Sequence, residues 1–211
     1  MKQLLKYKLA FSIFLIWLFH VSGIIGILIG YENWFVGLTP LNLLLCFGVV
    51  LWNIEPFSIK EMLILLIPFV IGFYAEYIGV HYGFLFGSYR YGDNLGYKLA
   101  DIPLMIGINW ALLIYASTGL SRYFSVNRYV RIVIASFLMV FLDFFMETTA
   151  PRFDFWVFKD GVAPLQNYIG WFLVALIANS CYMFFRPKVN QVLATHLYAV
   201  MLIFFVVFYF L

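Results

Sequence analysis

Charged side chains are scarce in this sequence. Only 11% of the 211 residues are Asp, Glu, Lys or Arg, whereas 65% are hydrophobic, and the mean hydropathy is +0.97. This composition lies far outside that of soluble globular domains. The formal net charge is only +3 and no nucleic-acid-binding motif occurs, so nucleic acid is excluded as a partner. We therefore expect an integral membrane protein.

Cysteine and metal-ligand patterns are also nearly absent. Cys46 and Cys181 are the only cysteines, and each lies inside an apolar run. They suggest neither a disulfide framework nor a metal knuckle. No HExxH or CxxC pattern occurs, so we predict no metal site. The last apolar run, residues 192–211, contains no lysine for a retinal Schiff base, which argues against a photoreceptor.

Apolar runs dominate what remains. About 20 consecutive apolar residues suffice to cross a bilayer as a helix. The first run follows three lysines, as in a signal peptide, but it is too long and no small-residue cleavage site follows it, so we interpret it as a retained helix. We predict an all-α polytopic protein, a single membrane domain over residues 1–211, with seven spans, the second short: 9–31, 38–54, 61–80, 102–120, 128–147, 168–185 and 192–211.

The basic residues predict the orientation. Cytoplasmic loops of membrane proteins carry an excess of Lys and Arg. A cytoplasmic N-terminus leaves four basic residues outside, Arg90, Lys98, Arg152 and Lys159, and nine inside, namely Lys2, Lys6, Lys8, Lys60, Arg122, Arg128, Arg131, Arg186 and Lys188. The asymmetry favours a cytoplasmic N-terminus.

Two connections are much longer than the others. Residues 81–101 and 148–167 emerge on the same side of the membrane, because successive helices alternate in direction. Both are rich in aromatic residues and glycine. Long loops of this kind in compact domains are usually functional, so we expect a site beneath them.

Polar residues within the spans gather below these two loops. Glu76, Asn109, Asp143 and Glu147 are all predicted at one level. Ionisable residues inside membrane spans are costly and tend to be functional. Asp143 and Glu147 are four residues apart and share one helical face, so the pair can provide both a protonated acid and a carboxylate base. Alternatively, Glu147 reaches the interface and Asp143 bonds to a neighbouring helix.

Several residues near this level have a structural interpretation as well. Glycines at positions 79, 83 and 87 indicate a helix-packing seam. His81 is an interface residue, a hydrogen-bond partner of a carboxylate or a proton shuttle. Asp101 precedes a span and is expected to be its N-cap, a role that is compatible with a second one in the site.

Aromatic residues surround the same polar level. The sequence contains 25 Phe, 15 Tyr and 6 Trp, many of them expected at the lipid interface. Aromatic faces stabilise cations, so a carbocation beneath a carboxylic acid would suit this environment. The residues predicted around this level are Tyr82, Tyr89, Tyr91, Trp110, Trp156 and Trp171.

Three segments carry a resemblance to a known family. They are "EYIGVHYGFLFGSYRYGDNLGYKLADIPLMIGINW" at 76–110, "DFFMETTAPRFDFWVF" at 143–158 and "GVAPLQNYIGW" at 161–171. Together they resemble the membrane carotenoid hydratases, a family that includes bisanhydrobacterioruberin hydratase and γ-carotene hydratase. The resemblance implies addition of water to the terminal double bond of an acyclic carotenoid, such as lycopene or γ-carotene, in the inner membrane of a bacterium.

The match to the family pattern is incomplete around the acid. In that pattern the acid is followed directly by proline, whereas here Glu147 is followed by two threonines, Ala150 and Pro151. The later segment matches at Asn167, Gly170 and Trp171.

Hydration of an unactivated alkene explains the layout of these residues. It requires a strong acid, shielding of a tertiary cation, and a directed water with a base, but no redox cofactor. We expect Glu147 or Asp143 to protonate the alkene, and the other carboxylate or Glu76 to deprotonate the water. The expected substrate-binding residues are His81, Tyr82, Tyr89, Asp101, Asn109, Trp110, Asn167 and Trp171.

Other functions remain open at this point. A carotenoid end-group cyclase also begins with alkene protonation, but the mass of its product is unchanged. A transporter is expected to show broken helices in two repeats, and the sequence has no internal symmetry. A structural membrane scaffold would not need carboxylates at one level.

Overall fold

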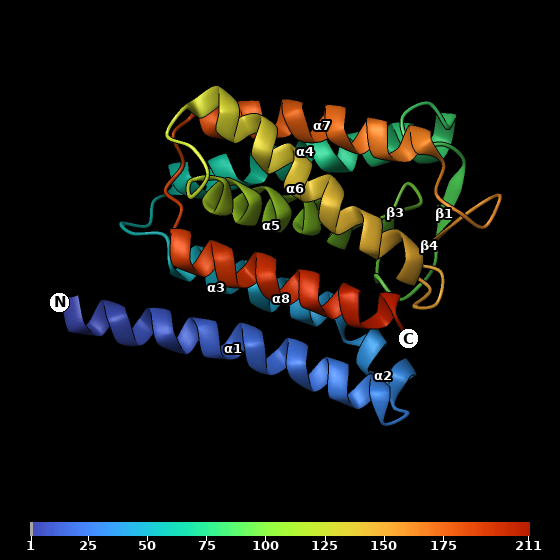
Figure 1. The fold of residues 1–211 in the computed structure, drawn as a ribbon, viewed down its shortest axis with the longest axis horizontal. Helices are drawn as coiled ribbons and strands as arrows, with labels where there is room; N and C mark the ends of the chain where they lie inside the picture. The colour runs from blue at the N-terminus through green and yellow to red at the C-terminus, as the bar shows by residue number, and fades with distance from the viewer. Residues whose placement is uncertain (1) are drawn as a thin grey trace.

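Long helices that lie side by side with their axes roughly aligned build almost the whole structure (Figure 1). The computed structural model describes residues 2–211. The helices are α1 (Lys2–Leu28), α2 (Glu32–Gly37), α3 (Thr39–Trp52), α4 (Ile59–Tyr82), α5 (Leu104–Ser121), α6 (Arg128–Thr149), α7 (Leu165–Phe184) and α8 (Gln191–Tyr209). Four short strands accompany them, β1 (Tyr89–Tyr91), β2 (Lys98–Leu99), β3 (Ile102–Pro103) and β4 (Trp156–Phe158).

Six of these helices are long and apolar enough to cross a membrane, namely α1, α4, α5, α6, α7 and α8. The expectation of an all-α polytopic membrane protein is confirmed. The second predicted span, 38–54, is the exception, because α3 within it has only 14 residues; the residues just before it form the separate short helix α2. A helix of that length is about 21 Å long, shorter than the hydrocarbon core of about 30 Å.

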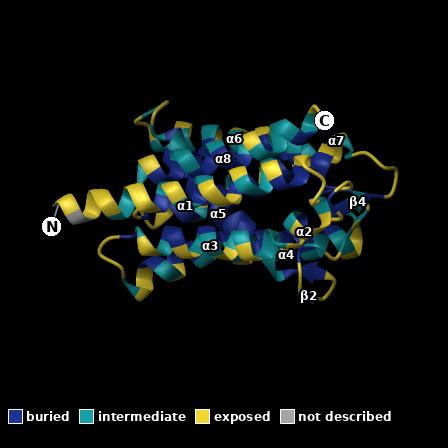
Figure 2. Cartoon of the chain, turned by 90° about the horizontal axis from the view of Figure 1, so that it is seen from below, coloured by how far each residue is buried: buried dark blue, intermediate teal, exposed yellow. Residues whose placement is uncertain are grey.

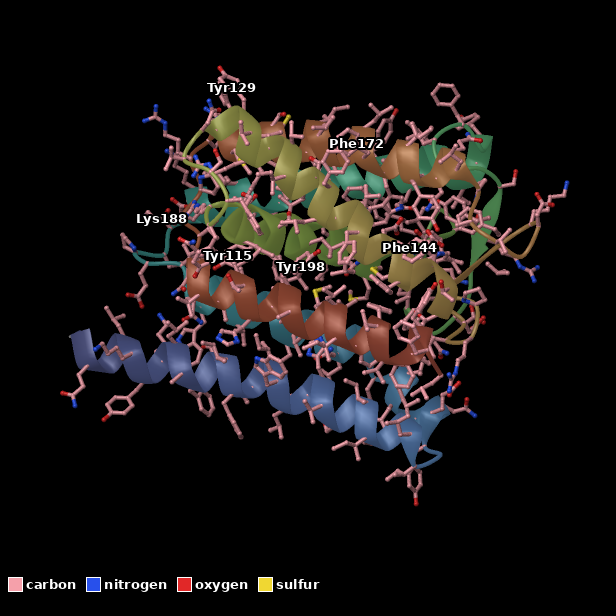
Figure 3. The ribbon with its side chains drawn as sticks, in the orientation of Figure 1. Tyr115, Tyr129, Phe144, Phe172, Lys188 and Tyr198 are labelled. Carbon is pink, nitrogen blue, oxygen red and sulfur yellow. The ribbon has the colours of Figure 1, made fainter. Side chains whose placement is uncertain are left out.

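Helix α5 forms the centre of the bundle. All but three of its residues are buried, and it packs against α3, α4, α6, α7 and α8. The outer helices turn one face inward and expose the other, as the mixed colours of Figure 2 show. Hydrogen bonds tie the packed elements together: the Tyr115 hydroxyl accepts from the Asn190 backbone at 3.1 Å, and the Tyr198 hydroxyl donates to the Leu138 carbonyl at 2.8 Å (Figure 3).

Two sequence expectations about local structure are wrong. The glycines do not form a continuous packing seam, because α4 ends where Gly83 adopts a left-handed conformation (φ 62°), and Gly87 (φ 91°) lies in the following loop. Asp101 is not a helix N-cap, since α5 starts after Pro103 and Asp101 occupies the turn between β2 and β3.

The two long loops fold together into one structure, which we call the aromatic cap (residues 83–103 and 150–164). Strand β1 of the first loop pairs antiparallel with β4 of the second, with Tyr89 opposite Phe158 and Tyr91 opposite Trp156. Strands β2 and β3 form a hairpin. The cap covers the end of the bundle where α4 and α6 finish and α5 and α7 begin (Figure 1).

Candidate functional site

Three carboxylates are buried beneath the aromatic cap. Glu76 of α4 is 3% exposed, Asp143 of α6 is fully buried, and Glu147 one turn later is 8% exposed. Glu76, Glu147 and Asn109 line one shared cavity, as their common level in the sequence predicted. Among the side chains that the structure describes (residues 3 and 5–211), no Lys, Arg or His forms an ion pair with any of the three.

Glu76 is surrounded by neutral hydrogen-bond donors. The indole N–H of Trp110 donates to Oε1 at 3.0 Å, while the hydroxyls of Tyr89 and Tyr91 donate to Oε2 at 2.5 and 2.7 Å. An ionised carboxylate only accepts hydrogen bonds, and all three partners are donors. The arrangement therefore suits an anion and supplies charge-assisted hydrogen bonds in place of a counter-cation.

The two tyrosines keep this donor role over a wide pH range. Burial raises the pKa of Tyr89 and of Tyr91 well above the usual value, and the charge of Glu76 raises both further. Their hydroxyls therefore stay protonated at any physiological pH. Because residues i and i+2 of a strand lie on the same face, β1 presents both tyrosines to Glu76.

Asp143 and Glu147 form a pair held by one amide. Asn167 Nδ2 donates to Asp143 Oδ2 at 3.2 Å and to Glu147 Oε1 at 2.8 Å. The indole of Trp156 donates to Glu147 Oε2 at 2.7 Å. Asp143 Oδ1 is buried without a hydrogen-bond partner. The two carboxylates thus share one helical face, as their spacing predicted, and Asp143 bonds to the neighbouring helix α7.

The local structure explains how Asn167 and Trp156 come to lie beside the Asp143–Glu147 pair. Asn167 lies in the first turn of α7, which starts after Pro164. Helices α6 and α7 pack closely along their length, so this turn lies beside the last turns of α6. Trp156 reaches the pair from β4, because pairing with β1 holds that strand across the end of the bundle.

The cavity between Glu76 and Glu147, which we call the carboxylate cavity, is small. It offers about 20 Å³ to the centre of a water-sized sphere, which is room for about one water molecule. Its walls are largely aromatic, and Trp110 stacks on Trp171 with ring centroids 4.4 Å apart. Phe86 and Phe158 complete the lining.

A larger cavity adjoins the first. It has a volume of about 210 Å³ and lies between α1, α3, α5 and α8. Ile106, Asn109 and Trp156 line both cavities. An elongated apolar molecule in the larger cavity would thus reach the carboxylates with one end.

Most of the sequence-predicted residues come together in this site. Tyr89, Asn109, Trp110, Asn167 and Trp171 line the carboxylate cavity together with Glu76 and Glu147. Asp143 lies directly behind Glu147, joined to it through Asn167.

The structure does not bring His81, Tyr82 or Asp101 to the cavity. Positions 81 and 82 lie about 140° and 240° around the helix from Glu76, so their side chains point elsewhere. Tyr82 is 72% exposed, and His81 Nε2 lies 3.8 Å from the exposed carboxylate of Asp101 at the rim of the cap. Asp101 lies in the turn between β2 and β3, and its side chain is 82% exposed.

Sequence reasoning placed Tyr91 and Trp156 near this level but did not assign them to the site. Both donate directly to a catalytic candidate, Tyr91 to Glu76 and Trp156 to Glu147. The signal in the sequence was the alternation of aromatic residues in "YRY" and "WVF", one in each long loop. Within residues 2–211, no three His, Cys, Asp or Glu side chains are grouped so as to hold a metal ion.

Comparison with known proteins gives one match. The model of a family described as carotenoid biosynthesis protein matches residues 38–211, which is most of the chain. No curated protein and no solved structure matches the chain. The matched segment contains all three buried carboxylates and the whole aromatic cap.

Proposed function

Since the chain belongs to the family of carotenoid biosynthesis proteins, we propose that it adds water to the terminal double bond of an acyclic carotenoid end group. The observation that carries this proposal is that Glu147 and Glu76 both line one cavity, which has room for one water. The adjoining apolar cavity suits a lipophilic substrate dissolved in the bilayer.

The acid in this proposal is the Asp143–Glu147 pair. Two carboxylates bridged by one amide and without a cation nearby repel each other when both are ionised. The pair therefore holds one shared proton. Glu147 lines the cavity whereas Asp143 does not, so Glu147 delivers the proton and Asp143 stabilises the pair before and after transfer.

The reaction balances without any further reagent. The proton of the pair adds to the less substituted carbon of the terminal double bond, and the alkene π electrons form the new C–H bond. This leaves a tertiary cation on the neighbouring carbon. The oxygen of a water molecule bonds to that cation, and the water loses a proton to a carboxylate. The product carries one tertiary hydroxyl, and the proton then returns to the pair.

Glu76 serves the second half of the reaction. Its anion, held by Tyr89, Tyr91 and Trp110, lines the same cavity as Glu147. A fixed negative charge there stabilises the cation and orients the water, whose proton it accepts. The stacked rings of Trp110 and Trp171 add cation–π stabilisation and shield the cation.

The test is expression in a host that accumulates lycopene or a monocyclic carotene. Pigments extracted from the membranes are analysed by liquid chromatography with mass spectrometry. A product heavier by one or two water molecules supports hydration. An isomer of unchanged mass would replace hydration by cyclisation, which uses the same acid but ends with proton loss. Unchanged pigment beside membrane-inserted protein contradicts both reactions for that polyene.

The same host tests the assignment of residues. Glu76→Gln, Asp143→Asn and Glu147→Gln are compared with the wild-type chain at equal protein levels in the membrane. Wild-type turnover in all three amide variants would contradict this site, whatever reaction the protein performs.

A further inference from the structure

The larger cavity has a wall that the family match does not include. We call this cavity the apolar groove, and its lining is mostly aromatic and aliphatic. Helix α1 contributes Phe19, Gly23 and Ile27, and α8 faces them with Met201 and Phe204. The match to the carotenoid biosynthesis family begins at residue 38, so all of α1 and α2 lies outside the matched segment.

Hydrogen bonds at three levels fix α1 to its neighbours. Asn53 donates to Ser12 Oγ at 2.7 Å near one end, and Trp17 Nε1 donates to His196 Nδ1 at 3.1 Å further along. His20 Nε2 lies 3.3 Å from Asn42 Nδ2, within the groove lining. Such bonds between membrane helices hold the helices in register. Helix α1 is therefore a positioned wall of the groove.

The groove opens to the lipid-facing surface between α1 and α3. Phe19 is 39% exposed and Leu41 is 55% exposed, yet both line the groove. Trp34 of α2, which is 63% exposed, lies at the same mouth. A molecule dissolved in the bilayer thus has access to the groove from the side.

The inner end of the groove meets the carboxylate cavity. Asn109 and Trp156 line both, and Trp156 donates its indole hydrogen to Glu147. The groove volume of about 210 Å³ is below the roughly 300–1,000 Å³ of sites that enclose a whole drug-sized ligand. It therefore suits the terminal part of a long polyene whose remainder stays in the lipid.

We propose that the apolar groove binds the terminal polyene segment of the substrate, which enters sideways between α1 and α3, and that α1 determines which polyenes fit. This proposal rests on the proposed function for the identity of the substrate. Burial of the apolar segment against α1 and α8 supplies binding free energy. Helix α1 thus selects among polyene substrates, and the carboxylates that perform the reaction come from the matched segment, residues 38–211.

Gly23 offers a direct test. A Cβ atom there would meet Phe204 at 3.7 Å, which is ordinary contact, so a leucine side chain at this position extends into the groove. Gly48 of α3 is exposed and has nothing within 4 Å of a Cβ, so Gly48→Leu is the matched control. Both variants, and the wild-type chain, are purified in detergent from a lycopene-producing host. Carotenoid absorbance per protein measures binding.

We expect Gly23→Leu to retain about tenfold less carotenoid, equivalent to about 1.4 kcal/mol of binding free energy, while Gly48→Leu retains the wild-type amount. If Gly23→Leu and the wild type retain equal amounts of carotenoid, the proposal that the groove binds the polyene is wrong. If Gly23→Leu loses carotenoid binding and the wild type also forms no hydrated product, the proposed binding role of the groove is supported and the proposed hydration is rejected.

A second pair of variants avoids the packed interior. Leu41 and Leu44 are both exposed on α3, at 55% and 47%, but only Leu41 lines the groove mouth. We expect Leu41→Trp to slow pigment uptake from carotenoid-loaded vesicles several-fold and Leu44→Trp to leave it unchanged. Equal uptake by both variants would contradict sideways access through this mouth, even if Gly23→Leu failed to fold.

Discussion

The two ends of the helix bundle carry opposite unbalanced charges. At the capped end, Glu76, Asp143 and Glu147 lack cations, and at the other end Arg122, Arg128, Arg131 and Arg186 lack acids within salt-bridge distance among residues 2–211. Tyr129 and Lys188 mark this second end in Figure 3.

The two ends satisfy their charges in different ways. Arg122 donates to the carbonyls of Val189 and Pro187, and the Arg128 guanidinium lies over the ring of Phe184. Arg186 is exposed, so its charge is solvated. The carboxylates instead are at most 8% exposed and depend on indole, phenol and amide donors. Buried charge without a counter-ion is costly and tends to be functional, which supports our proposal that the reactive site lies at the capped end.

The largest effect should follow from neutralising the pair at the capped end. Glu147→Gln removes the group that delivers the proton, and Asp143→Asn removes its partner. General acid catalysis contributes about a hundredfold or more, so we expect each variant to lose at least about a hundredfold of product formed per protein in membranes. Near-wild-type turnover in both would mean that the capped end is no more reactive than the arginine end.

Removing a hydrogen-bond donor of Glu147 should have a smaller effect, which is divided between stability and turnover. Trp156→Phe keeps the ring packed against Tyr91 but deletes the hydrogen bond to Glu147 Oε2. A hydrogen bond to a charged group contributes about 1.5–3 kcal/mol. We expect the unfolding free energy in detergent to fall by about that amount and turnover to fall about tenfold. Phe153→Leu, in the same loop, buried and outside the lining of both cavities, serves as the control for packing loss alone.

Alkaline pH should weaken the capped end selectively. Because burial and Glu76 raise the pKa of Tyr89 and Tyr91 above the unfolded value of about 10, the stability that their hydroxyls contribute is complete below pH 10. It is lost as the pH rises through the folded-state values. The double variant Tyr89→Phe, Tyr91→Phe should therefore show a shallower alkaline fall in thermal stability, and an unchanged slope would contradict this linkage.

The smallest effect is expected at the arginine end. Arg186→Gln removes one of its charges, and Arg186 is exposed and lines neither cavity. Surface substitutions usually change free energy by less than about 0.5 kcal/mol, so turnover in isolated membranes should stay within about twofold. A loss of turnover as large as that of Glu147→Gln would contradict the idea that only the capped end takes part in the reaction.

Helix periodicity and polarity predicted much of the site. The level of Glu76, Asn109, Asp143 and Glu147 follows from counting along apolar runs, because a helix has a fixed rise per residue. The same counting fails where a helix stops. His81 and Tyr82 are close to Glu76 in sequence, but the rotation of the last turn and the left-handed Gly83 direct the chain away from the cavity.

Pairing between distant loops could not be predicted from local pattern. Tyr91 and Trp156 are adjacent only because β1 pairs with β4, and the register of that pairing depends on the whole helix arrangement. The sequence also gave no sign that α1 and α8 would leave a groove between them, because a void results from how side chains fit and not from their order.

The short helix α3 has a consequence for the surrounding lipid. At about 21 Å it is about 9 Å shorter than a typical hydrocarbon core. A bilayer accommodates such hydrophobic mismatch by thinning locally, at a cost that grows with each ångström. Headgroups and water are thereby drawn toward the side of the protein where Leu41 and Trp34 lie. The protein is expected to favour thin membranes, and their lipid composition to influence how readily a polyene meets water at this site.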